Sequence, residues 1–457
     1  MVDVTLKIEL SRDLKLSDIP ETLKAELIGN LTIPNPKWLE NARMGRWNRN
    51  VPKLLRFFNR YKETLWIPRG YLRQLIIMCR HYKIPYQMED HRRKLPSVDF
   101  SFQGELKPFQ QRAVKKMLAR DFGTLNSPTG SGKTVMGLFM IAHRQQPALV
   151  VVHTKDLAYQ WIEQINHFLG IPESHIGLIG SGKKKIGDGI TVALVQSLYR
   201  CADVVSKHVG HIIVDECHRT PSRTFTDAVT EFDAIFMLGL SATPFRRDNL
   251  SNLIFWHLGD VHHSVDKSHL IEKGHILEAE IILRETDFEP YHDPVNSYSK
   301  MLLELTMNDE RNHLIASDVV KEIQKGKGVS LVLSDRKRHC ETLVSLLRYK
   351  HHVDADLLTG DLSNEKRQNV LRRVNTGAVP VVIATGQLVG EGFDCPNLTS
   401  LFLATPIRFS GRVLQYLGRV LRPAADKKNA RVYDYVDVKV GVLQSAATHR
   451  QKVYEAN

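Results

Sequence analysis

The chain carries the stretch Ser127-Pro128-Thr129-Gly130-Ser131-Gly132-Lys133-Thr134. A short apolar run, Phe122 to Leu125, precedes it, and a helical pattern, Val135 to His143, follows it. A strand that leads through a glycine loop into a helix points backbone N–H groups at one spot, where the helix dipole also favours negative charge. This context predicts a phosphate-binding loop. Ser127 stands where the usual pattern has its first glycine, and a chance glycine-rich turn is the alternative.

Each residue type in this loop has a chemical use. Gly130 and Gly132 let the backbone approach a phosphate without a Cβ in the way. Lys133 can reach the β and γ phosphates, and the hydroxyl of Thr134 can hold Mg²⁺. The residues predicted to bind the nucleotide here are Thr129, Gly130, Ser131, Gly132, Lys133 and Thr134.

The bulk properties narrow the class of protein. The 457 residues suffice for two to four domains, and a net charge of +13 makes a polyanion an expected partner. The five cysteines form no C-x-x-C pair, so neither a disulfide framework nor a zinc site is indicated. No apolar run approaches the ~20 residues that span a bilayer, and the N-terminus has no signal-peptide core. We expect a soluble, cytoplasmic protein without a membrane partner.

Residues 1–103 are predicted to form a small basic α+β accessory domain. Between Lys37 and Lys94 basic residues far outnumber acids, and aromatic residues are interleaved with them. Helical spacing over residues 54–58 and again over 72–79 predicts two helices, separated by a turn at residues 68–70. A solvated face usually mixes charge signs, so we interpret this region as binding nucleic acid, although most of its aromatics could form a core. The expected contacts are Arg46, Arg49 and Arg56.

Residues 104–280 and 281–457 each alternate apolar runs with helical patterns. Runs such as Ala148–Val152 and Val329–Leu333 are almost wholly apolar. Strands of this kind are typical of a parallel sheet covered by helices on both faces. The sequence therefore predicts two α/β domains in tandem, of which only the first has a phosphate loop.

A pair of acids, Asp215 and Glu216, follows the apolar run Ile212–Val214. In a doubly wound sheet the carboxyl end of such a strand lies beside the phosphate loop. Asp215 is then placed to hold Mg²⁺ through water, and Glu216 to orient and deprotonate an attacking water. A plain exit from strand to loop is the alternative. Ser241-Ala242-Thr243 follows the next strand, where its hydroxyls could bond the acid pair or form a simple turn.

Two arginines lie far downstream in the segment Gln415–Arg422, which is predicted to be helical. Arg419 and Arg422 are three residues apart, so both project from one face. Fixed guanidinium groups suit the charge that builds up on a transferring phosphoryl group. Because they belong to the second domain, hydrolysis would require the cleft between the domains to close.

Together these motifs resemble a superfamily 2 helicase, in the branch that includes XPB and the phage UvsW-type helicases. The resemblance covers about residues 105–450. The matching segments, in the family's order, are Leu106–Gln110, Ser127–Thr134, Val152–Leu157, Val192–Leu198, Asp215–His218, Ser241–Thr243, Leu331–Asp335, Ala384–Asp394 and Gln415–Arg422.

The resemblance implies two RecA-like domains that hydrolyse ATP and move 3′ to 5′ along a strand. It places Gln110 on the adenine, Gly392 and Asp394 at the nucleotide, and Gln415 in the catalytic set with the two arginines. It also implies contacts that hold the strand's backbone without reading bases. These contacts are Thr154, Gln196, Thr359 and Thr385.

The expected function is an ATP- and Mg²⁺-dependent DNA helicase acting on forks and junctions in recombination, replication or repair, including branch migration. We expect a monomer that works with other recombination or replication proteins. The alternatives are an RNA helicase, the double-stranded DNA translocase subunit of a restriction or defence complex, or a binding module with an inactive ATPase. Little room remains between Cys395 and Gln415 for a strand-separating hairpin. Any wedge is therefore expected in the N-terminal region, whose removal (residues 1–95) should spare ATP hydrolysis and reduce fork unwinding.

Overall fold

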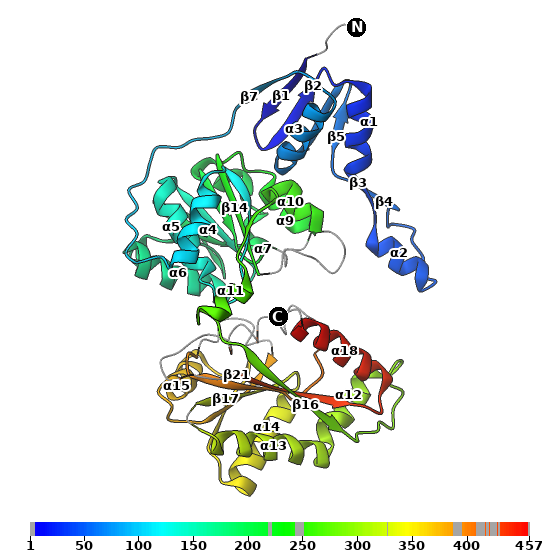
Figure 1. The fold of residues 1–457 in the computed structure, drawn as a ribbon, viewed down its shortest axis with the longest axis vertical. Coiled ribbons are helices and arrows are strands. Elements are labelled where there is room, and N and C mark those ends of the chain that lie inside the picture. Colours follow the sequence, from blue (N-terminus) through cyan, green and yellow to red (C-terminus); the bar gives the residue numbers. More distant parts are fainter. Residues whose placement is uncertain are drawn as a thin grey trace. The chain divides into compact units, whose positions relative to one another are not determined.

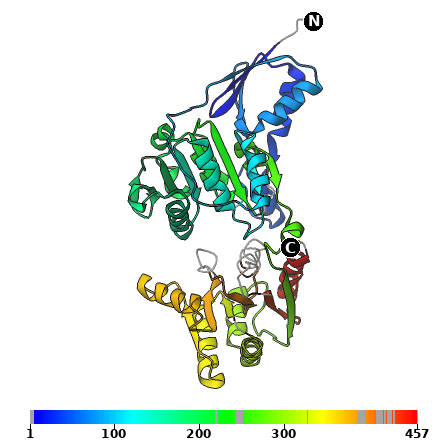
Figure 2. The ribbon, with the colours of Figure 1, turned by 60° about the vertical axis from the view of Figure 1, so that its left-hand side comes forward.

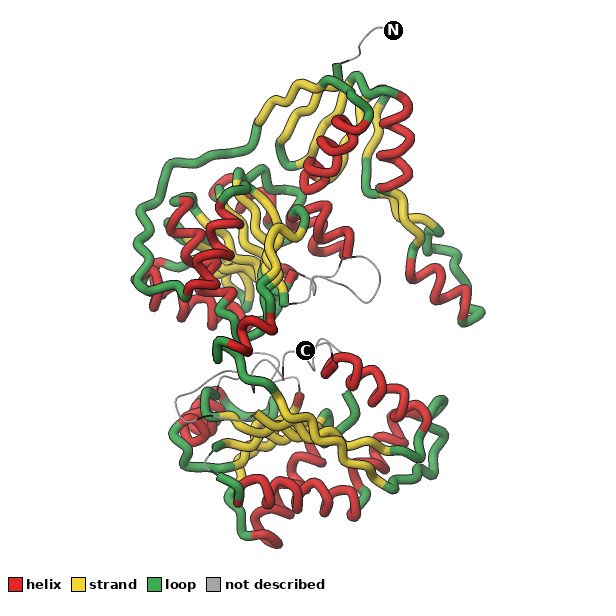
Figure 3. Tube along the Cα trace, viewed as in Figure 1, coloured by secondary structure: helices red, strands yellow, loops and turns green. Residues whose placement is uncertain are grey.

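The structure, a computed structural model, describes residues 5–217, 222–242, 251–326, 328–386, 395–407 and 430–455, together with residues 416, 420 and 427. The chain divides into two compact units, one built from residues 1–127 and 132–265 and the other from residues 128–131 and 266–457 (Figures 1 and 3). The first unit holds a five-stranded and an eight-stranded sheet, and the second holds a six-stranded sheet.

The N-terminal region is an α+β layer. Its sheet has the order β5-β6-β2-β1-β7. In β1, Leu6, Ile8 and Leu10 are buried and alternate with more exposed residues, which is the period of a strand with one covered face. A separate two-stranded ribbon, β3 with β4, carries helix α2. The elements are β1 Leu6–Leu10, β2 Asp13–Ser17, α1 Glu21–Asn30, β3 Thr32–Pro34, α2 Pro36–Arg43, β4 Leu54–Arg56, β5 Asn59–Tyr61, β6 Thr64–Pro68, α3 Leu72–His81 and β7 Tyr86–Asp90.

One of the two helices predicted here is wrong. Residues 54–56 form strand β4, whose Leu54 pairs with Pro34 of β3. The apolar run 54–58 is too short to distinguish a helix from a strand, and pairing with a distant segment decided its form. The second predicted helix is present as α3, and Pro68-Arg69-Gly70 joins it to strand β6 rather than to another helix.

The first parallel sheet has the order β11-β10-β12-β9-β13-β14-β8-β15, and only β11 runs antiparallel to its neighbour. Along β9, Val150 and Val152 pack into one core and Leu149 and Val151 into another, so helices cover both faces as predicted. The strands are β8 Phe122–Asn126, β9 Ala148–Val152, β10 Gly177–Gly180, β11 Lys183–Lys185, β12 Ile190–Leu194, β13 His211–Val214, β14 Phe236–Ser241 and β15 Val261–Ser264. The helices are α4 Pro108–Leu118, α5 Lys133–Arg144, α6 Lys155–Leu169, α7 Val195–Leu198, α8 Ala202–Val205, α9 Ser222–Val229, α10 Ser251–Leu258 and α11 Lys267–Glu272.

The second parallel sheet has the order β16-β21-β20-β17-β19-β18, with every pair parallel. Side chains of α13 and α14 share one core with its central strands, and both helices follow the same face (Figure 2). The strands are β16 Ala279–Thr286, β17 Val329–Ser334, β18 Ala355–Leu358, β19 Val381–Thr385, β20 Leu398–Leu403 and β21 Ala430–Asp437. The helices are α12 Tyr298–Met307, α13 Asp309–Gln324, α14 Lys337–Ser345, α15 Asn364–Asn375 and α18 Gly441–Glu455.

The N-terminal region shares its core with the first parallel-sheet domain. Trp256 of α10 packs against Phe57, with ring centres 5.1 Å apart, and belongs to the N-terminal core. Arg69 is 2% exposed and donates to the carbonyl of Ala234 at 2.9 Å. A Cβ on Gly70 would lie 2.4 Å from the carbonyl oxygen of Phe255, so only glycine fits there.

This shared core corrects the expectation for the truncated chain. Removal of residues 1–95 would expose Trp256 and Leu253, which the N-terminal core now covers. Burying such side chains contributes roughly 1.5–3 kcal/mol each. The truncated protein would therefore lose stability in the domain that carries the phosphate loop, and its ATPase would not be spared cleanly.

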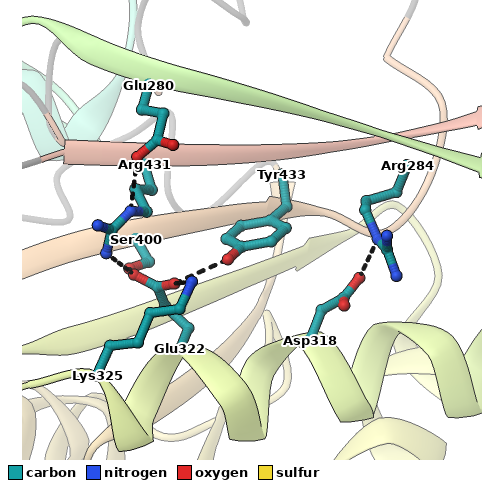
Figure 4. Close-up of polar contacts among 8 residues, drawn as sticks. All are labelled: Glu280, Arg284, Asp318, Glu322, Lys325, Ser400, Arg431 and Tyr433. Carbon is teal, nitrogen blue, oxygen red and sulfur yellow. Dashed lines mark hydrogen bonds and ion pairs between the residues drawn. The ribbon is translucent and has the colours of Figure 1, made fainter.

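In the second unit, Glu322 of α13 ties the helix to the edge of the sheet (Figure 4). Its carboxylate accepts hydrogen bonds from Ser400, Arg431, Tyr433 and Lys325. Arg431 also donates to Glu280 of β16 at 2.8 Å, which joins the edge strand to its neighbour. Burial raises the pKa of Glu322, but the hydrogen bonds from Arg431, Tyr433 and Ser400 outweigh it and hold this pKa below its usual range.

We expect Glu322→Gln to lower the free energy of unfolding of the second unit by about 2–3 kcal/mol. The amide keeps the shape but presents N–H groups where Arg431 and Tyr433 also donate. The loss of stability stays at the low end of the range for a broken buried ion pair, because Arg431 still donates a hydrogen bond to Glu280. Denaturant unfolding measures it, with Ser400→Ala as the control that removes a single neutral donor and costs about 1 kcal/mol. Unchanged stability in Glu322→Gln would show that the network adds no net stability.

Acid is expected to destabilise the protein through three buried histidines, His211, His257 and His339. Burial lowers the pKa of His257 to about 4 and of His339 to about 3, and that of His211 falls well below its usual value. Unfolded histidines, with a pKa of about 6.5, then bind more protons than folded ones, so stability falls as pH drops below about 6.5.

Each histidine contributes up to about 1.4 kcal/mol per pH unit within its window. The thermal midpoint should therefore fall steeply from pH 6.5 to pH 4.5. His339→Gln should flatten the profile of the second unit, and His449→Gln, at an exposed histidine of the same unit, should leave it unchanged. A midpoint that stays constant down to pH 4.5 would contradict this account.

Candidate active site

Sheet order brings three predicted motifs to one edge. Strands β13, β14 and β8 are adjacent and parallel, so their carboxyl ends point the same way. The loop after β8 leads to Lys133, and β13 leads to Asp215 and Glu216. The backbone N–H of Ser127 donates to the carbonyl of Ser241 at 2.9 Å, which joins the loop to the end of β14.

The loop has the backbone that a phosphate site requires. Gly130 and Gly132 have φ of +87° and +82°, a region that side chains with a Cβ rarely adopt. Gly132 caps helix α5, so the helix N-terminus opens at the loop. A Cβ on Gly132 would lie 2.4 Å from Nε2 of Gln110, which places this predicted adenine contact against the loop. The Oγ of Ser131 donates to the carbonyl of Pro128 at 2.6 Å.

A compact charge cluster lies beside the loop. Lys133 is 9% exposed, and its Nζ lies 3.6 Å from Oε1 of Glu216 and donates to the carbonyl of Ser127 at 3.2 Å. Oδ1 of Asp215 accepts the Glu216 backbone N–H at 2.8 Å, and its Oδ2 accepts the indole N–H of Trp161 at 2.8 Å. Glu216 has φ of +45°, a strained value for a residue with a Cβ, of the kind that persists at functional sites.

The electrostatics of this cluster suit a divalent cation. Burial, and after it the charge of Glu216, raise the pKa of Asp215 to about 6, although Trp161 and Lys133 act in the opposite direction. Two carboxylates therefore share one ammonium in a site shielded from water. Mg²⁺ prefers oxygen ligands, and Asp215 with the hydroxyl of the half-buried Thr134 supplies them. The residues present thus fit the ion that the motifs imply.

Trp161 is the functional residue that sequence reasoning missed. It lies on α6 in an amphipathic pattern, where a tryptophan predicts core packing, and it is indeed 1% exposed. A buried indole N–H needs an acceptor. That requirement was the available signal, but the sequence does not say which acceptor is near.

In the second unit, parts of three predicted motifs also meet. The hydroxyl of Tyr416 donates to the carbonyl of Gly386 at 2.5 Å. A Cβ on Gly386 would lie 2.8 Å from that hydroxyl and 3.0 Å from Oδ1 of Asp335. The backbone N–H of Asp335 donates to Thr405 at 2.8 Å. Several predicted residues lie outside the described part of the chain: His218, Thr243, Gly392, Asp394, Gln415, Arg419 and Arg422.

The predicted strand contacts fall on two sheet edges. Thr154 and Gln196 follow β9 and β12, which are parallel neighbours, so both lie at the carboxyl edge of the first sheet. Thr154 caps α6 by accepting the N–H of Leu157 at 3.3 Å, and Gln196 is exposed. In the second unit Thr385 is half-buried, and Thr359 is 3% exposed, which leaves little of it accessible.

The three predicted arginine contacts of the N-terminal region, Arg46, Arg49 and Arg56, are all exposed. Their side chains are therefore accessible to a phosphate backbone. Among the described residues, no helix combines the length and the apolar character needed to cross a bilayer.

Two sequence families match the chain. The family described as "Type III restriction enzyme, res subunit" matches residues 103–246, which span the phosphate loop and the acid pair. The family described as "Helicase conserved C-terminal domain" matches residues 312–424, which span the later motifs.

Similar proteins come from several organisms and viruses. L396 of Acanthamoeba polyphaga mimivirus, by its name a candidate ATP-dependent RNA helicase, is 25% identical over 79% of this chain and 69% of its own length. "DNA 3'-5' translocase XPB2" of Sulfurisphaera tokodaii is 26% identical over 75% of this chain and 85% of its own. "Probable helicase D10" of Escherichia phage T5 is 25% identical over 87% of this chain and 84% of its own.

The fold has solved counterparts. The Saccharomyces cerevisiae protein Dbp5, bound to RNA and ADP BeF3, matches with a TM-score of 0.54 at 14% identity, over 77% of this chain and 88% of its own. The predicted pair of RecA-like parallel-sheet domains is thus confirmed. This chain belongs to the superfamily 2 helicases, in the branch that contains the XPB-type and phage helicases, and it is an ATP-dependent hydrolase.

Proposed function

We propose that the chain is a DNA helicase that moves 3′ to 5′ and acts on branched DNA in recombination, replication or repair. The observation that carries this proposal is the buried cluster of Lys133, Asp215 and Glu216, which lies at the same sheet edge as Thr154 and Gln196. A change in the nucleotide at this edge can therefore alter the grip on a strand through the same sheet. The name of the XPB2 relative supports DNA and the polarity.

For each step of ATP hydrolysis, a side chain among the described residues has a proposed role. The Lys133 ammonium and the N–H groups of the loop bind the β and γ phosphates. Glu216, whose Oε1 lies 3.6 Å from Nζ of Lys133, orients the attacking water and accepts its proton. Asp215 and Thr134 would hold Mg²⁺, which supplies positive charge to the phosphate oxygens. Trp161 fixes the Asp215 carboxylate through its second oxygen.

Residues of the second unit complete the proposal. Arg419 and Arg422 would supply guanidinium groups to the γ phosphate, and Gln415, Gly392 and Asp394 would contribute to nucleotide binding and catalysis. Hydrolysis then depends on both domains, which couples the chemistry to their relative motion and so to a step along the strand. Thr154, Gln196, Thr359 and Thr385 would hold the strand's phosphates and sugars.

Two other functions have a specific observation in their favour. The name of the mimivirus relative supports an RNA helicase, and motor contacts to phosphates do not by themselves choose the sugar. The family description of residues 103–246 supports a translocase that moves along duplex DNA without separating it. Both are outcomes of the experiment that follows.

Strand displacement by the purified chain tests the proposal. With ATP and Mg²⁺ it should separate DNA forks and four-way junctions much faster than RNA duplexes of the same sequence. Lys133→Ala should lose at least about 100-fold in ATP turnover, because the phosphate charge is no longer neutralised. Lys184→Ala, an exposed lysine on β11 of the same sheet, is the matched control and should behave as the wild type.

Each of the other possible outcomes supports a different function or site assignment. RNA unwinding at the rate of DNA unwinding would favour the RNA helicase. Displacement of a third strand from duplex DNA without strand separation would favour the translocase. Normal ATP turnover in Lys133→Ala would show that the nucleotide site is assigned wrongly.

Trp161→Phe should reduce ATP turnover without unfolding the first unit. The ring keeps most of the packing, but Asp215 loses a hydrogen bond to its charged oxygen, which is worth about 1.5–3 kcal/mol. If that loss falls on the transition state, kcat drops roughly 10- to 100-fold. Steady-state kinetics measures the change, and Trp256→Phe at the N-terminal core is the control for a buried tryptophan elsewhere. Equal kcat in Trp161→Phe and the wild type would remove Trp161 from the site.

A further inference from the structure

An unusual tryptophan lies on the segment between β3 and β4. We call residues 35–53 the basic arm; it contains α2 and the loop that follows. Trp47 in this loop is 84% exposed, whereas Trp161 is 1% and Trp256 is 6% exposed. An indole this exposed belongs to none of the hydrophobic cores of the first unit. Its flat apolar face is therefore accessible to a ligand.

The loop that presents Trp47 is held by side-chain hydrogen bonds. Nδ2 of Asn35 donates to the carbonyl of Pro52 at 2.8 Å, which closes the base of the arm. Next to Trp47, Nδ2 of Asn48 donates to the carbonyl of Trp38 at 3.1 Å, and its Oδ1 accepts from Asn41 at 2.9 Å. These hydrogen bonds hold the loop against α2, so the position of the Trp47 indole is set by the surrounding structure.

The charge around Trp47 is almost entirely positive. The only acid in residues 35–53 is Glu40. The basic residues of the arm, all exposed, are Lys37, Arg43, Arg46, Arg49 and Lys53. The guanidinium of Arg49 lies 5.9 Å from the centre of the Trp47 ring. A flat apolar face with guanidinium groups beside it matches a ligand that has phosphates next to flat rings.

We propose that Trp47 stacks on an unpaired base at the point where a DNA duplex opens, while Arg46 and Arg49 hold the adjoining phosphates. Within a duplex, each base face is covered by its neighbours, so an indole can stack only on an end, a junction or an unpaired strand. A protein partner with acidic residues would satisfy the arginines but would leave the indole face without a flat counterpart. This inference rests on the proposed function, because it takes branched DNA as the ligand.

The consequence is a division of labour within the chain. The motor residues hold phosphates and sugars and cannot distinguish a fork from a plain strand. The basic arm adds a contact that exists only where pairing ends. A base stacked on Trp47 cannot pair again with its partner. The duplex therefore cannot re-form at the junction after the motor has moved forward.

The test compares Trp47→Ala and Trp47→Phe with Met44→Ala, an exposed apolar residue of the same arm that is 55% exposed. Binding is measured on a fork and on a duplex closed by hairpins at both ends. A stacked base contributes about 1–3 kcal/mol, so Trp47→Ala should weaken fork binding roughly 5- to 100-fold. Trp47→Phe should recover most of this, Met44→Ala should match the wild type, and the closed duplex should bind all three equally.

A fluorescent base makes the stacking visible. 2-Aminopurine at the first unpaired position of the fork should be quenched by the wild type and by Trp47→Phe, and not by Trp47→Ala. Arg46→Gln and Arg49→Gln should instead weaken fork and closed duplex alike, and each should lower the salt dependence of binding by about one ion.

The outcomes separate this inference from the function on which it rests. Undiminished fork binding and quenching in Trp47→Ala overturn it. An equal loss on fork and closed duplex also overturns it, because the residue then only supports the arm. If the wild type neither binds nor unwinds DNA forks, the proposed function itself fails. Equal thermal midpoints for wild type and Trp47→Ala, expected for so exposed a side chain, confirm that folding is intact.

Discussion

Two carboxylates held beside one lysine, away from water, are the constraint on which the first domain depends. Asp215 and Glu216 would repel each other in that setting without Lys133 and the indole of Trp161. Charges of this kind are costly to bury unless every member has a partner. The left-handed backbone of the loop glycines turns the chain so that Lys133 lies beside the two carboxylates. The parallel order β13-β14-β8 places the two acids at the same sheet edge as the loop.

A second constraint joins the N-terminal region to that domain. Arg69 is buried and forms no ion pair with a carboxylate among the described residues. Burial lowers its pKa to about 10, so it remains charged at neutral pH. Its hydrogen bond to the carbonyl of Ala234 and the packing of Trp256 make the N-terminal sheet an integral layer of the first unit. The basic arm is therefore carried by the same unit as Lys133 and the acid pair Asp215 and Glu216. The N-terminal region is thus joined to the first parallel-sheet domain by packed side chains as well as by the chain itself.

In the second unit, a network of polar side chains joins several elements of the fold. Glu322 joins α13, β20 and β21, and through Arg431 it reaches the edge strand β16. That strand is the first element of the sheet after α11, so the point where the chain enters the second domain is anchored by a charged network. At the opposite end of the strands, Asp335, Gly386 and Tyr416 hold three motifs against one another. Both sheets thus place their motifs at the carboxyl ends of parallel strands, where loops from neighbouring strands converge.

The sequence by itself determined the phosphate loop, the acid pair and the tandem parallel sheets, because these follow from local rules. A glycine pattern between strand and helix, and wholly apolar runs between amphipathic helices, carry their meaning within a few residues. Tertiary structure decided what depends on distant partners. Residues 54–56 became a strand because β3 lies beside them. Trp161 of α6 became a hydrogen-bond donor to Asp215 because the fold brings these distant residues together. Among similar basic and aromatic residues, only burial showed that Arg69 supports an internal contact while Trp47 faces solvent, since composition records which residues are present but not what covers them.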